Sequence, residues 1–282
     1  MPSDAPLGRD DLIFYSATLF GSPLEEKLIA AESGGFAGIG LWASDVTAAR
    51  TAGLSDGDVR QMLADRNLHC AGMDCLFGWA GGESLPPDPA FNIGVEAIID
   101  AASALGAPAI NLAHAFGDRI DAVAAPERLA QICDRAGAAG LEVLIEPIPW
   151  GGIPTIHAAR ALIVASGATN ARLTIDAWHF FRAGWQPDDI AALPPTLFGA
   201  IQFCDAASTA GVDHWADTSD RNLPMHGELA VAELATMLRR IGYAGPFGIE
   251  CPSLAWNDLD AATVGQRCGD AMRRLCDHAT AR

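Results

Sequence analysis

The strongest constraint on the fold is an alternation, repeated along all 282 residues, of short apolar segments with longer amphipathic or alanine-rich segments. Repeated strand–helix units produce this pattern, because their parallel strands are buried beneath helices. Strands are predicted at Leu12–Ser16, Gly38–Leu41, His69–Asp74, Ala109–Leu112, Val143–Glu146, Leu173–Asp176, Ala200–Phe203 and Phe247–Glu250. Helices are predicted at Leu24–Ser33, Asp56–Asn67, Asn92–Leu105, Pro126–Ala139, Thr155–Ala165, Gln186–Ala192, Val231–Ile241 and Leu259–Ala279. Eight units in a chain of this length predict an α/β fold, a (β/α)8 TIM barrel formed as one domain over residues 1–282.

Two long segments are predicted to be loops that follow strands. Gly78–Pro89 is rich in glycine and proline, and Ala206–Leu223 is polar. In a barrel, the loops that follow strands rise on the face where catalysis occurs. A doubly wound open sheet is the rival fold, but no glycine fingerprint follows the first predicted strand.

Polar side chains end or lie near the end of the last four predicted strands. Glu146, Asp176 and Glu250 end the fifth, sixth and eighth strands, and Gln202 lies in the seventh. A single carboxylate in such a place is usually a helix cap or a salt-bridge partner. Three that converge on one rim repel each other unless a cation joins them. This oxygen-rich set suits Mg²⁺ or Mn²⁺, so we expect a divalent metal site.

Several segments in order carry a resemblance to a known family. They are Ser22–Glu26, Gly35–Trp42, Leu144–Pro147, Ile175–His179 and Gly242–Glu250. Together they resemble the xylose-isomerase-like sugar isomerase and epimerase barrels, and the resemblance covers nearly the whole chain. That family includes ketose 3-epimerases, hydroxypyruvate isomerases, inosose dehydratases and 3-dehydroshikimate dehydratases.

The resemblance implies roles for individual residues at the rim. Glu146, Asp176 and Glu250 match three of the family's four metal ligands. Gln202 falls where many members have a histidine, and its side chain offers only a carbonyl oxygen as a ligand. Hydroxypyruvate isomerases and some dehydratases are similar in this respect, which weakens the ketose epimerase interpretation.

Further family positions concern the substrate. His179 matches a histidine near the substrate, and Arg221 matches an arginine that often reaches substrate oxygens. The family commonly has Pro-Gly-x-Gly after this arginine, whereas this chain has Pro224, Met225, His226 and Gly227. This departure puts the substrate in doubt and adds His226 as a candidate substrate contact.

The residues favour chemistry that begins with removal of a proton next to a carbonyl. A cation stabilises the resulting enediolate, and carboxylates at the rim can transfer the proton. We expect Glu146 and Glu250 to be the acid–base pair on opposite faces of a small sugar or hydroxy-keto substrate, with His179 bonded to a substrate oxygen. The predicted function is a metal-dependent isomerase or epimerase. The alternatives are a dehydratase of a β-hydroxy ketone, with His179 as the base, and a sugar-binding barrel without activity.

Other residues are weaker candidates for the pocket. His114 follows the fourth strand and is expected either to face the substrate or to be a structural histidine. Trp42 ends the second strand and Trp150 follows Glu146, so both are candidates for the pocket wall.

Charge and composition exclude several classes of protein. The formal net charge is −17, from 18 basic and 35 acidic residues, which disfavours binding to nucleic acid or to anionic membranes. The N-terminus lacks the apolar core of a signal peptide, so a cytoplasmic enzyme is expected. The seven cysteines include no Cys-x-x-Cys pair, and the single lysine, Lys27, lies in a predicted helix, which argues against Schiff-base chemistry. Apolar residues in the long loops leave room for a homo-oligomer interface.

Overall fold

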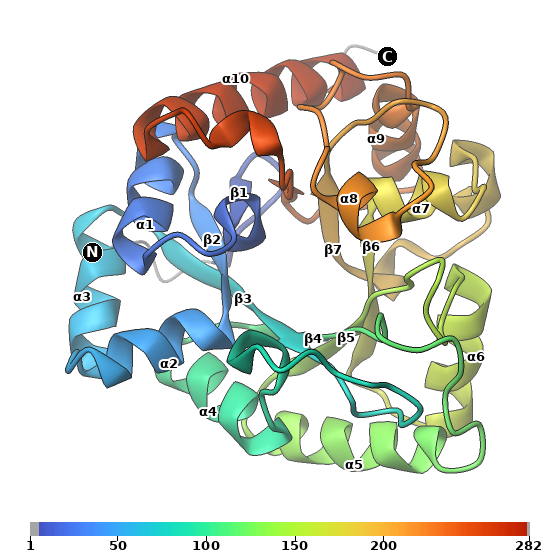
Figure 1. The fold of residues 1–282 in the computed structure, drawn as a ribbon. Helices are drawn as coiled ribbons and strands as arrows, with labels where there is room; N and C mark the ends of the chain where they lie inside the picture. Colours follow the sequence, from blue (N-terminus) through green and yellow to red (C-terminus); the bar gives the residue numbers. More distant parts are fainter. Residues whose placement is uncertain (1–5, 281–282) are drawn as a thin grey trace. The chain divides into compact units, whose positions relative to one another are not determined.

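Eight parallel strands form a closed barrel in the computed structural model, which describes residues 6–280 (Figure 1). The strands follow one another around the barrel in chain order. They are β1 (Leu12–Tyr15), β2 (Gly38–Trp42), β3 (His69–Leu76), β4 (Ala109–Leu112), β5 (Glu142–Ile145), β6 (Ala171–Asp176), β7 (Phe198–Phe203) and β8 (Phe247–Ile249). The predicted (β/α)8 barrel is confirmed.

Helices connect the successive strands. They are α1 (Leu24–Ser33), α2 (Ala43–Thr51), α3 (Asp56–Asp65), α4 (Val95–Leu105), α5 (Ala125–Ala138), α6 (Ile156–Ser166), α7 (Ala177–Arg182), α8 (His214–Thr218), α9 (Val231–Arg240) and α10 (Ala261–Thr280). Short 3₁₀ turns are η1 (Ser16–Leu19), η2 (Pro89–Phe91), η3 (Pro187–Ile190), η4 (Pro195–Leu197) and η5 (Leu254–Trp256). Within residues 6–280, no helix is both long enough and apolar enough to cross a membrane.

The helix after β6 differs from the sequence prediction. The predicted helix Gln186–Ala192 is wrong, because only the 3₁₀ turn η3 forms there. Instead α7 begins directly after Asp176, whose carboxylate accepts hydrogen bonds from the first free amides of the helix. A side-chain oxygen at this position satisfies amides that have no partner within the helix. Helices α2 and α8 were not predicted; α2 begins directly after β2 with no loop between them, and α8 has only five residues.

Contacts divide the described chain into two compact units. In the unit of residues 40–61 and 70–175, β3 pairs with β4, β4 with β5 and β5 with β6, and Ile145 of β5 lies opposite Leu173 of β6. In the unit of residues 6–39, 62–69 and 176–280, β8 pairs with both β1 and β7, and Gln202 lies opposite Gly248. Parallel pairing brings the carboxyl ends of neighbouring strands to the same edge, so the register decides which strand-end residues are neighbours.

The last helix packs closely on the first. A Cβ atom on Gly265 of α10 would lie only 1.9 Å from the carbonyl oxygen of Ala30 in α1. A Cβ atom on Gly269 would lie 2.1 Å from the carbonyl oxygen of Gly34. Only glycine allows this approach of two helix backbones. The predicted closing helix therefore forms and contacts α1.

Candidate metal centre

Glu146 follows β5 directly, and its buried carboxylate is oriented by two polar residues from neighbouring strands. Its Oε2 accepts a hydrogen bond from Nδ2 of Asn111 in β4, at 2.9 Å. The amide of Asn111 is turned by Thr174 of β6, whose hydroxyl donates to Oδ1 of Asn111 at 2.8 Å. A chain of hydrogen bonds from Thr174 through Asn111 therefore orients Oε2 of Glu146. No role for Asn111 or Thr174 was predicted from the sequence, where each is visible only as a polar residue inside an otherwise apolar strand.

Asp176 is the last residue of β6 and is 2% exposed. Its Oδ1 accepts the backbone amides of Trp178 and His179 at 2.7 and 3.2 Å. Its Oδ2 accepts a hydrogen bond from Nη1 of Arg221 at 2.6 Å. Burial is the largest single effect and raises the pKa of Asp176, but the charge of Arg221 together with the hydrogen bonds that the carboxylate accepts holds the pKa below its ordinary value. Asp176 is therefore a carboxylate at neutral pH.

Arg221 is also buried and is bonded to protein groups on several sides. Besides Asp176, its Nη1 donates to the carbonyl oxygen of Glu250 at 3.3 Å, and its Nη2 donates to the Thr218 hydroxyl at 3.2 Å. Its guanidinium carbon lies 4.8 Å from the centre of the Trp178 ring. The resemblance implied an arginine that reaches substrate oxygens, and the structure places this one against Asp176. In this arrangement Arg221 compensates a buried negative charge.

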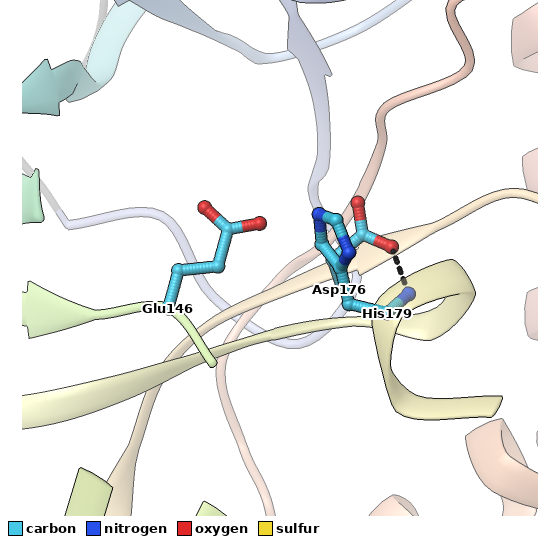
Figure 2. Close-up of side chains that lie close together, drawn as sticks. All are labelled: Glu146, Asp176 and His179. Carbon is cyan, nitrogen blue, oxygen red and sulfur yellow. Dashed lines mark hydrogen bonds between the residues drawn. The ribbon is translucent and has the colours of Figure 1, made fainter. Parts of the chain in front are cut away.

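Glu146, Asp176 and His179 form a buried group that can hold a metal ion. One potential ligand atom from each lies within 4.8 Å of the others, and Figure 2 shows the three side chains together. Two of them are neighbours because β5 and β6 pair in parallel and Glu146 and Asp176 come at the ends of those strands. His179 joins them because it is in the first turn of α7.

The imidazole of His179 is neutral at physiological pH. Burial lowers the pKa of His179 to about 4, although the charge of Asp176 opposes this effect. A neutral imidazole can accept a proton or bind a metal ion through a ring nitrogen. The sequence predicted a contact with substrate for His179, and the structure adds its proximity to two expected metal ligands.

Gln202 lies in β7, and Glu250 comes directly after the adjacent strand β8. Gln202 is 1% exposed, and its Oε1 has no hydrogen-bond partner among the described residues. A buried amide oxygen without a partner is costly, and a cation would satisfy it. Glu250 follows β8. Burial lowers the pKa of Arg221, but the charge of Asp176 and, to a smaller extent, that of Glu250 raise it above its ordinary value. Glu250 is outside the group formed by Glu146, Asp176 and His179.

The remaining candidates from the sequence lie in different surroundings. Both ring nitrogens of His114 are bonded to backbone groups, since Nδ1 accepts the amide of Gly152 at 2.9 Å and Nε2 donates to the carbonyl of Gly81 at 3.0 Å. These bonds favour the structural alternative for His114. His226 is exposed in the loop after β7, and it follows Met225, whose φ of 65° lies in the left-handed region. This is the conformation that glycine, the common family residue at position 225, adopts at little cost.

Trp42 belongs to a group of aromatic residues that we call the aromatic wall. The wall consists of Trp42, Phe77, Phe91, Phe116 and Trp150, which lie at or after the ends of β2, β3, β4 and β5. The ring centres of Phe77 and Phe116 are 5.1 Å apart, and Trp42 lies 5.7 Å from Phe91. Trp42 and Trp150 were predicted to line the pocket, whereas the three phenylalanines were not, because they are spread over two loops.

The donor set fits a divalent cation. The carboxylates of Glu146 and Asp176 lie in one buried group, and the amide oxygen of Gln202 has no hydrogen-bond partner among the described residues. Hard oxygen donors of this kind bind divalent metal ions. Arg221 offsets part of the negative charge but leaves the set anionic.

Two named relatives match most of this chain. It is 26% identical over 251 residues to a putative hydroxypyruvate isomerase of Streptomyces coelicolor, covering 81% of this chain and 85% of that protein. It is 27% identical over 270 residues to a 3-dehydroshikimate dehydratase of Pseudomonas aeruginosa, covering 89% of this chain but only 39% of that protein. The relatives therefore carry the names of two different reactions.

The fold is also found in solved structures, and a family model matches the chain. The structure of the IOLI protein with a bound zinc atom superposes with a TM-score of 0.81 at 16% identity, covering 96% of this chain and all (100%) of that one. The model of the xylose isomerase-like TIM barrel matches residues 28–278. This match covers most of the barrel, including all of the rim residues described above. The chain therefore belongs to the xylose isomerase-like TIM-barrel family.

Proposed function

We propose that this protein is a divalent-metal-dependent isomerase or epimerase that removes a proton next to the carbonyl of a small sugar or hydroxy-keto compound. The observation that carries the proposal is the buried group of Glu146, Asp176 and His179, which combines two carboxylates with a neutral imidazole. Buried ionisable groups whose pKa values are shifted cluster at catalytic sites. The isomerase name of the Streptomyces coelicolor relative supports the same class of reaction.

The metal would be held by Glu146, Asp176, Gln202 and Glu250. Their oxygen donors favour Mg²⁺ or Mn²⁺, whereas a nitrogen ligand such as His179 would make the site more suitable for zinc. When bound, such a cation polarises a carbonyl group and stabilises the negative charge that develops on its oxygen. Because Oδ1 of Asp176 already accepts two amides and Oδ2 accepts Arg221, Asp176 has its remaining lone pair on Oδ2 for this role.

The protein side chains have separate parts in moving the proton. Glu146 is the proposed base, because Asn111 holds one of its oxygens and thereby fixes the orientation of the other. Glu250 is proposed to return the proton. His179 can accept a hydrogen bond from a substrate hydroxyl, since its imidazole is neutral.

Elimination of water is the second candidate reaction. It begins with the same proton removal and continues with loss of a β-hydroxyl group, which needs a proton donor. His179 could serve there after taking up the abstracted proton. The dehydratase name of the Pseudomonas aeruginosa relative favours this alternative.

Proton exchange tests the proposal and separates the reactions. The purified protein, supplied with Mn²⁺ or Mg²⁺ in D₂O, is incubated with ketoses, hydroxypyruvate, inososes and 3-dehydroshikimate and followed by NMR. We expect deuterium next to a carbonyl, loss of exchange with chelator, and loss of exchange in Glu146→Gln with the fold retained. A product that has lost water would identify a dehydratase. No exchange and no metal binding would leave a barrel that only binds its ligand.

A further inference from the structure

Glu83 is a buried carboxylate in the loop between β3 and η2, and the reaction proposed above does not use it. Its side chain is 0% exposed. Oε2 accepts the backbone amide of Gly78 at 2.6 Å, and Oε1 accepts the amides of Ala115 and Phe116 at 2.9 and 3.1 Å. A single side chain therefore fastens the loop after β3 to the loop after β4. Charge-assisted bonds of this kind are stronger than those between neutral groups.

His114 fastens a third loop to the same place. Its ring bridges the carbonyl of Gly81, after β3, and the amide of Gly152, after β5. The backbones are so close that a Cβ atom on Gly151 would lie 1.7 Å from the carbonyl oxygen of His114. Glu83 and His114 thus hold together the loops after three consecutive strands.

The groups that Glu83 holds carry two members of the aromatic wall. Phe116 is bonded through its own amide, and Phe77 immediately precedes the bonded Gly78. Their rings contact each other edge to face, and Phe91 lies 5.1 Å from Phe116 and 5.7 Å from Phe77. Movement of either peptide group would therefore move the rings.

The aromatic wall lies at the edge of the sheet that carries Glu146. Glu146 directly follows β5, and the residues of the wall lie at or after the ends of β2 to β5 in the same compact unit. Phe77 is buried, whereas Trp42, Phe91, Phe116 and Trp150 are only partly buried. Aromatic surface that remains accessible beside polar groups is typical of small-molecule sites. It suits the C–H face of a hydroxylated substrate while the carboxylates address its oxygens.

We propose that Glu83 is a positioning residue for substrate binding. By holding the amides of Gly78 and Phe116, it fixes the Phe77–Phe116 pair as the surface against which the C–H face of the substrate lies. The inference rests on the proposed function for its location, but it concerns binding and not proton transfer.

Paired variants test the inference with 3-dehydroshikimate and hydroxypyruvate as probes. Glu83→Gln keeps the size of the side chain, but an amide nitrogen cannot accept a hydrogen bond, so at least one loop is released. We expect Glu83→Gln and Phe116→Leu each to raise KM about tenfold, with kcat within about threefold of the parent. In the double variant, the effect should be less than the product of the two, because both changes act through one ring.

A matched variant controls for loss of a capping carboxylate. Asp58→Asn changes an exposed carboxylate that accepts the amide and hydroxyl of Ser55 at the start of α3. It should leave KM unchanged. Amide hydrogen exchange should be faster at Gly78, Ala115 and Phe116 in Glu83→Gln only. Unchanged KM, a loss confined to kcat, or multiplicative effects in the double variant would overturn the inference.

Calorimetric titration separates this inference from the proposed function. If no probe exchanges its α-proton but one binds, and binding weakens with the same coupling between Glu83 and Phe116, the proposed reaction fails and the positioning role stands. If exchange occurs and the variants bind and react as the parent does, the reaction stands and the positioning role fails. If neither probe binds the parent protein, the positioning role is also overturned.

Discussion

Nη1 of Arg221 donates a 2.6 Å hydrogen bond to Oδ2 of Asp176, and both side chains are at most 3% exposed. Removing one member of a buried pair leaves an uncompensated charge and costs about 3–5 kcal/mol. We therefore expect Arg221→Met to lower the free energy of unfolding by that amount in urea titrations. The second change Asp176→Asn should restore part of it.

The exposed pair Arg135–Glu96 provides the control for this effect. Its side chains are 57% and 77% exposed, and exposed pairs contribute only about 0–1 kcal/mol. Arg135→Met should therefore be nearly neutral. Equal losses in the two variants would show that the Asp176 charge is not the cause.

We expect the hydroxyl of Thr174 to affect the rate of α-proton exchange, because it orients the amide of Asn111. In Thr174→Val the amide of Asn111 loses the bond that orients it, so Glu146 loses a fixed donor. We expect about tenfold slower α-proton exchange with little change in KM, and a stability loss of about 1 kcal/mol. Thr47→Val, which removes a hydroxyl bonded to a helix carbonyl in α2, should cost stability without slowing exchange. A normal rate in Thr174→Val would contradict the role of this chain of hydrogen bonds.

Gln202 offers a test of the metal that does not depend on activity. Its Oε1 is buried without a hydrogen-bond partner among residues 6–280, so Gln202→Leu should be as stable as the parent, or up to about 1–3 kcal/mol more stable, in chelator. Adding Mn²⁺ should raise the melting temperature of the parent more than that of the variant, because a ligand that binds only the folded state stabilises it. Equal shifts in both proteins would remove Gln202 from the ligand set.

Asp205 predicts a pH dependence of stability. Burial raises the pKa of Asp205, although its carboxylate accepts the amides of Leu229 and Ala206. A raised folded-state pKa means that ionisation opposes folding, so this group stabilises the fold below its unfolded pKa of about 3.9 and loses that contribution as pH rises through the folded value. In Asp205→Asn, the free energy of unfolding measured by urea titration across this acidic range should not show this loss as pH rises. If the free energy of unfolding depends on pH in the same way in both proteins, other carboxylates are the cause of the pH dependence.

Much of the site could be predicted because strand ends define it. Glu146, Asp176, Gln202 and Glu250 were named from their places in four apolar segments, and the structure puts them in or directly after β5 to β8. Strand burial follows from apolar composition alone, and parallel strands in a barrel end at one rim. The error at Gln186–Ala192 arose because the side chain of Asp176 starts a helix nine residues earlier than the residue pattern suggested.

The partners of the polar side chains could not be predicted in the same way. Whether Arg221 meets substrate or Asp176, and whether His114 faces a pocket or two backbone groups, depends on residues more than thirty positions away. Nothing in the sequence indicated that Glu83 is buried, since a glutamate in a glycine-rich loop is ordinarily exposed.

The sequence by itself determined the barrel and the strand ends that carry the candidate ligands, because both depend on local hydrophobic periodicity. Only the tertiary structure decided which charge Arg221 neutralises and which loops Glu83 joins. The reason is physical: a buried polar group must satisfy its hydrogen bonds with whatever long-range packing brings within about 3 Å, and that choice is not encoded in neighbouring residues.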